Sequence, residues 1–177
     1  IQHGCQGDLH FAYGSWSNVP HDGYELLPSF FWCWSDYEVK SINRWSGNSS
    51  RRHCALKGGN LWLQQWIGSK SEFARVYDNI ILTIKRSRKE SKHIIVTQGG
   101  GIHGNHFLNI LTAIKKSPDS WYWWIRIHPC ELRLKAKLSS MLRQDLIDNV
   151  NVDDATNLPL YGLLRHMDCH VTGFSST

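Results

Sequence analysis

The sequence predicts an α/β fold built on a parallel sheet. From residue 92 onward, short apolar runs alternate with amphipathic stretches. The expected strands are His93–Thr97, Trp121–Ile127, Val150–Val152 and Cys169–Thr172, and the expected helices between them are Asn105–Lys116, Glu131–Leu146 and Leu160–Met167. Strands that alternate with helices in this way are typical of a parallel sheet with right-handed crossovers.

The first half of the chain predicts fewer elements. Phe30–Trp34 is a short apolar run that predicts a buried strand, and Ser35-Asp36 can cap a helix near Tyr37–Trp45. The remaining segments are a weak strand at His53–Lys57, a short helix or turn at Leu61–Gly68 and an ambiguous apolar-periodic stretch at Glu72–Lys85. The charged run Lys85–Lys92 is the best candidate linker. Domains are therefore expected at residues 1–90 and 91–177.

The composition indicates a globular protein with an anionic partner. The chain has 177 residues, of which 41% are hydrophobic, and this content argues against disorder. A net charge of +5 suits an anionic ligand or an anionic membrane surface. The five cysteines are odd in number and form no CxxC pair, so we expect reduced thiols, a cytoplasmic location and no metal. The start at Ile1 without Met, and the end at Thr177, predict a piece of a longer protein.

Three short motifs follow the carboxyl ends of expected strands, where ligands bind in open α/β sheets. They are the glycine turn Gly99, Gly100 and Gly101, the pair His128-Pro129 with Arg126 on the same strand face, and the hydroxyl pair Ser175 and Ser176. Backbone amides at a glycine turn and at a helix N-terminus favour phosphate. Each motif alone also fits an ordinary turn or strand cap, and Arg126 also fits a pairing with a carboxylate. Their common position predicts a ligand that carries phosphate.

A fourth candidate lies near the start of the chain. His3 is flanked by Gln2 and Gly4, and Asp8 follows closely. A histidine on such a loop can act as a general base near neutral pH. An ordinary polar loop is the simpler alternative.

The ordered motifs QHG, LLPSFFWCW, GGN, HP and LPLYGLLRHMDCHVTGFSST resemble the GT-B glycosyltransferases of bacterial surface polysaccharides. The chain is most similar to the group that contains capsule Kdo transferases, bacterial sialyltransferases and CDP-glycerol glycerophosphotransferases. The resemblance implies a Rossmann-like domain that binds the donor nucleotide, truncated at its C-terminus, preceded by the end of an acceptor-side domain. It implies a CMP- or CDP-linked donor, a glycan or glycolipid acceptor, no further cofactor, and peripheral association with the inner face of the membrane.

The same resemblance implies residue roles. His128 and Pro129 would contact the donor nucleotide and its phosphate, and Ser175 and Ser176 would bind the phosphate. His3 would act as the base, with Asp8 as a second candidate. The chain lacks a clear (Asp/Glu)-(Asp/Glu)-Gly base motif and the Glu-Ala segment of related enzymes, so UDP- and GDP-linked donors stay open.

Two other functions compete with this interpretation. A nucleotide-sugar epimerase of the UDP-GlcNAc 2-epimerase type shares the two-domain fold, but few carboxylates lie near the expected cleft. A non-catalytic polysaccharide-binding domain would use some of the nine tryptophans as stacking platforms. Nucleic-acid binding is disfavoured because no recognised module or Arg-rich arm is present.

Overall fold

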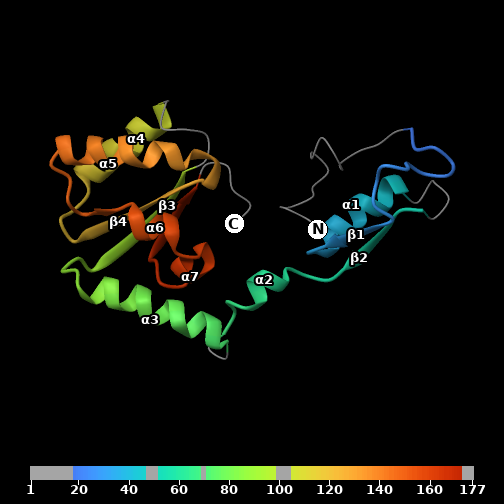
Figure 1. The fold of residues 1–177 in the computed structure, drawn as a ribbon, viewed down its shortest axis with the longest axis horizontal. Coiled ribbons are helices and arrows are strands. Elements are labelled where there is room, and N and C mark those ends of the chain that lie inside the picture. Colours follow the sequence, from blue (N-terminus) through green and yellow to red (C-terminus); the bar gives the residue numbers. More distant parts are fainter. Residues whose placement is uncertain (1–17, 47–51, 69–70, 99–104, 173–177) are drawn as a thin grey trace. The chain divides into compact units, whose positions relative to one another are not determined.

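The computed structural model describes residues 18–46, 52–68, 71–98 and 105–172. Contacts divide the chain into a first unit within Ile1–Gln64 and a second unit within Gln65–Ser175 (Figure 1). The expected boundary at residue 90 therefore falls later than the observed one, and helix α3 (Glu72–Arg86) belongs to the second unit. Among the described residues, no helix has the length and apolar character that crossing a bilayer requires.

The first unit is a parallel strand pair covered on one face by a helix. Its elements are β1 (Phe30–Cys33), α1 (Asp36–Ser46), β2 (Cys54–Lys57) and α2 (Leu61–Gln64). Strands β1 and β2 pair in parallel, with Phe31 opposite Ala55. Phe31 and Cys33 alternate inward and pack against Ile42 and Trp45 of α1. The expected strands and helix of this half are confirmed.

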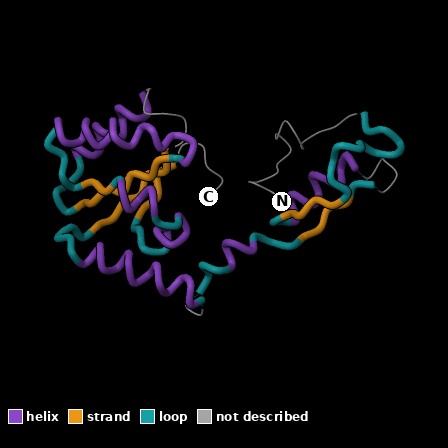
Figure 2. Tube along the Cα trace, viewed as in Figure 1, coloured by secondary structure: helices purple, strands orange, loops and turns teal. Residues whose placement is uncertain are grey.

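The second unit is an α/β layer structure with a parallel sheet, as predicted (Figure 2). Besides α3, its elements are β3 (Lys92–Gln98), α4 (Asn105–Lys116), β4 (Trp121–Ile127), η1 (Pro129–Leu134), α5 (Lys135–Gln144), β5 (Val150–Asn151), α6 (Asp153–Asn157), α7 (Leu160–Leu164) and β6 (Cys169–Thr172). The strand order is β5-β4-β3-β6, and every pair is parallel.

Each face of this sheet has its own core. Residues Trp123 and Ile125 of β4 pack under α4 and α5, whereas Tyr122 and Trp124 pack under α3, α6 and α7 (Figure 1). Trp124 is completely buried. A parallel strand covered on both faces is apolar at nearly every position, which explains the continuous run that begins at Trp121.

Arg165, just after α7, explains why the second unit begins near Gln65. Its Nε and Nη2 donate to both carboxylate oxygens of Asp78 in α3, at 3.1 and 2.9 Å. Its Nη1 donates to the carbonyl oxygens of Trp66 and Gly68. One guanidinium thus fastens α3 and the segment before it to the rest of the unit. These hydrogen bonds join residues that are far apart in the sequence, so sequence patterns did not reveal them. The sequence therefore predicts the linker at the charged run Lys85–Lys92, although the second unit begins before it.

Several element boundaries differ from the prediction. The ambiguous stretch at Glu72–Lys85 is helix α3, which begins where Ser71 Oγ accepts from the Ala74 N–H at 3.3 Å. The helix expected over Glu131–Leu146 is replaced by the 3-10 turn η1, inside which the backbone of Glu131 is non-helical, and by helix α5, which begins only at Lys135. Helix α6 was not expected, and α7 ends at Leu164, earlier than predicted.

Candidate functional site at the carboxyl edge

Three strands of the second unit end side by side. In the parallel pairing, Thr97 of β3 lies opposite Arg126 of β4 and also opposite Thr172 of β6. We call the edge at which β3, β4 and β6 end the carboxyl edge. The strands that precede the three predicted phosphate motifs are therefore neighbours that end at the same level, as the sequence predicted.

A polar row crosses the sheet just inside this edge. Paired residues of parallel strands point to the same face, and side chains alternate between faces along a strand. Ile95 and Trp124 point to the face under α3, α6 and α7. Thr97 and Arg126 lie two positions later on the same strands, so they point to that face as well. Thr172 is paired with Thr97 and therefore also points there, and these three side chains form the polar row. The apolar core of this face thus gives way to polar side chains at the carboxyl edge.

Arg126 has a structural task in this row. Its Nη1 donates to the carbonyl oxygens of Ala155 and Leu158, at 2.7 and 2.6 Å. Burial lowers the pKa of the guanidinium. The structure does not show the alternative pairing of Arg126 with a carboxylate, because its partners are the carbonyl oxygens of Ala155, within α6, and of Leu158, just after it. The predicted phosphate contact of Arg126 would use its other nitrogens, and it stays a prediction.

His128 ends β4 as predicted and caps the turn that follows. Its Nδ1 accepts a hydrogen bond from the Cys130 N–H at 3.2 Å, and Pro129 occupies the first position of η1. Proline suits this position because its missing N–H would have no partner in the helix. Since Nδ1 accepts, the proton of the neutral ring lies on Nε2. His128 is exposed, so this Nε2–H is available to a ligand.

A hydrogen-bonded pair that sequence reasoning missed lies beside this row. Thr97 Oγ1 and His170 Nε2 are 2.9 Å apart, and both side chains are partly buried. Burial lowers the pKa of His170, which favours the neutral ring. The alternation CHVT does place His170 and Thr172 on one strand face. Their proximity to Thr97, however, follows from the pairing of β3 with β6, which the sequence did not reveal.

The other predicted site residues lie outside the described part of the chain. They are His3, Asp8, Gly99, Gly100, Gly101, Ser175 and Ser176. Their roles stay predictions. Among the residues that the structure does describe, no group of three or more His, Cys, Asp or Glu side chains could hold a metal ion.

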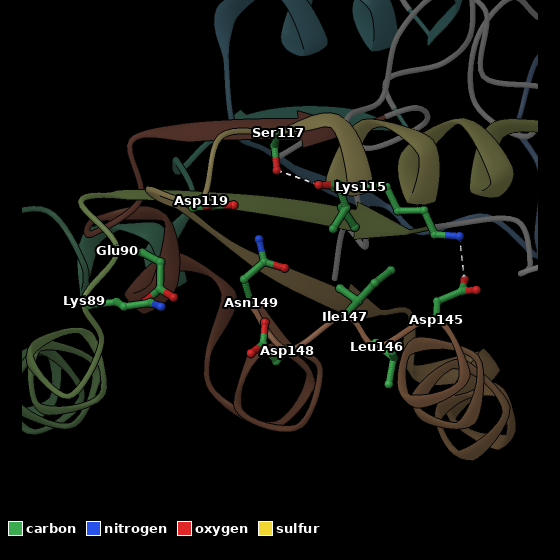
Figure 3. A pocket seen from close by; sticks show the side chains of 11 residues that line it. Lys89, Glu90, Lys115, Ser117, Asp119, Asp145, Leu146, Ile147, Asp148 and Asn149 are labelled. Carbon is green, nitrogen blue, oxygen red and sulfur yellow. Dashed lines mark hydrogen bonds and ion pairs between the residues drawn. The ribbon is translucent and has the colours of Figure 1, made fainter.

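A pocket of about 270 Å³ lies at the opposite end of the strands (Figure 3). It is lined by the segments that lead into β3, β4 and β5, represented by Glu90, Asp119 and Asn149. Lys115 and Asp145 form an ion pair of 3.0 Å at its rim. Ligands of open α/β sheets bind at the carboxyl ends of strands, so this hollow is distinct from the predicted site.

Comparison of the chain with family models, with curated proteins and with solved structures finds no match.

Proposed function

We propose that this chain carries the donor-binding part of a GT-B glycosyltransferase. The enzyme would transfer a sugar or a polyol phosphate from a nucleotide-activated donor to a glycan or glycolipid acceptor. The observation that supports this most is the carboxyl edge, where three adjacent parallel strands end at a polar row and at His128. The resemblance of the motifs to this family supplies the reaction class, and the net charge of +5 suits a donor that carries phosphate.

The proposed chemistry follows from these groups. The acceptor hydroxyl attacks the anomeric carbon of the donor, and His3 or Asp8 takes up the hydroxyl proton. The bond between the anomeric carbon and the donor phosphate oxygen breaks, and the nucleotide leaves with the electron pair. His128 Nε2–H donates to the phosphate as negative charge accumulates on it. Ser175, Ser176 and the amides of the glycine turn assist in the same way. For a CDP-alcohol, the attack falls on phosphorus instead.

The test separates the ligand contact of His128 from its capping contact. Asparagine is a good N-cap residue, so His128→Asn keeps an acceptor for the Cys130 N–H and removes the ring Nε2–H. Titration calorimetry with CMP, CDP, UDP and GDP measures the effect. A hydrogen bond to a charged group contributes about 1.5–3 kcal/mol, so we expect affinity to fall roughly 10- to 100-fold. His21→Asn is the matched control, because the His21 side chain is 90% exposed in the first unit.

Two outcomes would contradict the proposal. One is a wild-type chain that binds none of the four nucleotides. The other is a His128→Asn variant that binds its nucleotide as tightly as the wild type does. An epimerase would be distinguished by product formed from a nucleotide-sugar without any acceptor.

A non-catalytic glycan-binding role is supported by a different feature, the Trp32 indole in the first unit. The residue is 41% exposed, and its Nε1 donates to the Gly59 carbonyl oxygen at 2.8 Å. It packs so closely on Gly58 that an added Cβ would lie 1.9 Å from the ring, so only glycine fits beneath it. Fixed, exposed aromatic rings suit stacking on sugars. Glycan affinity lost in Trp32→Ala, with no nucleotide affinity in the wild type, would favour this role.

A further inference from the structure

The course of the chain predicts a crevice at one point along the carboxyl edge. From β3 the chain proceeds to β4 and then to β5, and both crossovers, α4 and α5, pack on one face of the sheet. From β5 the chain returns through α6 and α7, which pack on the other face, and enters β6 on the far side of β3. The two series of crossovers therefore diverge between β3 and β6. Such a switch point leaves a crevice beyond the strand ends, and ligands of open α/β sheets bind there.

The side chains at this switch point are Thr97, His170 and Thr172. Thr97 and Thr172 are paired across β3 and β6, and Thr97 Oγ1 lies 2.9 Å from His170 Nε2. Thr172 is exposed, and the other two are partly buried. The floor of the predicted crevice, which these two hydroxyls and the imidazole would form, is therefore polar and lies one strand away from His128.

The chemistry of this floor suits a neutral group with several hydroxyls. If Thr97 donates to His170 Nε2, the ring keeps an N–H on Nδ1; if the ring donates, the Thr97 hydroxyl keeps its own hydrogen. Either arrangement leaves one donor, and Thr172 adds a donor and two acceptors. An ionised phosphate only accepts hydrogen bonds and would leave the acceptors of these side chains unused, whereas the vicinal hydroxyls of a sugar both donate and accept.

We infer that Thr97, His170 and Thr172 bind the ribose hydroxyls of the donor nucleotide at the β3–β6 switch point. This inference rests on the proposed function, since it assigns one part of that donor to one part of the site. Neighbouring strands lie about 4.8 Å apart, which is close to the separation between a ribose and its 5′-phosphate. A nucleotide with its ribose over β3 and β6 therefore brings its phosphate toward β4 and His128. In this arrangement His128 binds the phosphate, and the Thr97–His170 pair binds the ribose of the nucleotide.

The experiment compares ribonucleotides with their deoxy counterparts. The affinities of CMP, CDP, UDP and GDP are measured by titration calorimetry beside those of the 2′-deoxy and 3′-deoxy forms. For the nucleotide that binds, we expect the wild type to prefer the ribo form over one deoxy form roughly three- to tenfold, the effect of one hydrogen bond. Thr97→Val keeps a β-branched strand residue and removes the hydroxyl, so the preference should shrink toward one. His170→Asn should reduce it as well.

The control variant is Thr83→Val, because the Thr83 hydroxyl is exposed on α3 and donates to the Asn79 carbonyl oxygen. It should leave the ribose preference unchanged. Thermal unfolding of Thr97→Val checks that the central strand is intact. A wild type that binds a nucleotide without any ribose preference, or a Thr97→Val variant that keeps the preference, overturns the inference and leaves the proposed function standing. A wild type that binds no nucleotide overturns both.

Discussion

Replacing Leu146 by glycine should stabilise the second unit. Helix α5 ends in a Schellman motif, in which the Ile147 N–H donates to the Leu142 carbonyl oxygen at 2.9 Å and the Leu146 N–H donates to that of Arg143 at 3.2 Å. The residue after the C-cap of this motif adopts a left-handed conformation, and glycine usually occupies it. Here Leu146 does so, with a φ of 55°, and it is the only non-glycine residue with positive φ in the described ranges.

The size of the effect follows from two opposing contributions. A left-handed conformation costs an L-residue about 1–2 kcal/mol. Glycine loses about 0.5–1 kcal/mol more conformational freedom on folding. The Leu146 side chain is 90% exposed, so its removal sacrifices little packing. The free energy of unfolding should therefore rise by about 0.5–1 kcal/mol, equivalent to about 2–4 °C in Tm for a unit of this size.

Urea and thermal unfolding followed by tryptophan fluorescence would measure the change. Leu146→Ala is the matched control, because it removes the same exposed side chain and retains a Cβ in the left-handed region. We expect Leu146→Ala to lie within about 0.5 kcal/mol of the wild type, as surface substitutions usually do. If Leu146→Gly is no more stable than Leu146→Ala, backbone strain at this position is negligible and the reasoning is wrong.

Two further predictions concern buried groups of the second unit. Gly162→Ala should destabilise the protein by about 1–3 kcal/mol in urea unfolding, because the new Cβ would lie 2.9 Å from the ring of buried Trp66; unchanged stability would show that the ring moves freely. Burial lowers the pKa of His93, whose Nδ1 accepts from Trp124 Nε1 at 3.1 Å. Below about pH 6.5, the ordinary histidine value, His93 binds a proton in the unfolded chain but stays neutral in the folded chain. The free energy of unfolding should therefore fall as the pH drops below that value. His93→Gln should flatten this dependence, and an unchanged slope would assign it to other groups.

Elements with strong local signals were predicted well. Strand β4 begins and ends where the sequence placed it, Trp121–Ile127, because an apolar run meets Pro129, which cannot join a ladder. Helix α4 also keeps its expected bounds of Asn105–Lys116. Helix α6 was missed although Asn151, a residue type that often caps helices, comes just before it. In the structure Asn151 Oδ1 accepts from the Asp154 N–H at 2.9 Å, as a capping side chain does. Five residues are too few for a periodic pattern to emerge.

The site was predicted only as far as local signals extend. Apolar runs followed by turn residues indicate that strands end near residues 98, 127 and 172. The geometry of a parallel sheet then places these strand ends at one edge. The order β5-β4-β3-β6, however, depends on which strands pair, and no short segment encodes it. Sequence reasoning therefore centred the site on His128, at the end of the longest apolar strand. The strand order moves the proposed centre of the site by one strand, to the switch point between β3 and β6, because the crossovers diverge there. A histidine inside β6, which reads as an ordinary strand residue in isolation, thereby becomes the partner of Thr97 and the stronger candidate for ligand selection.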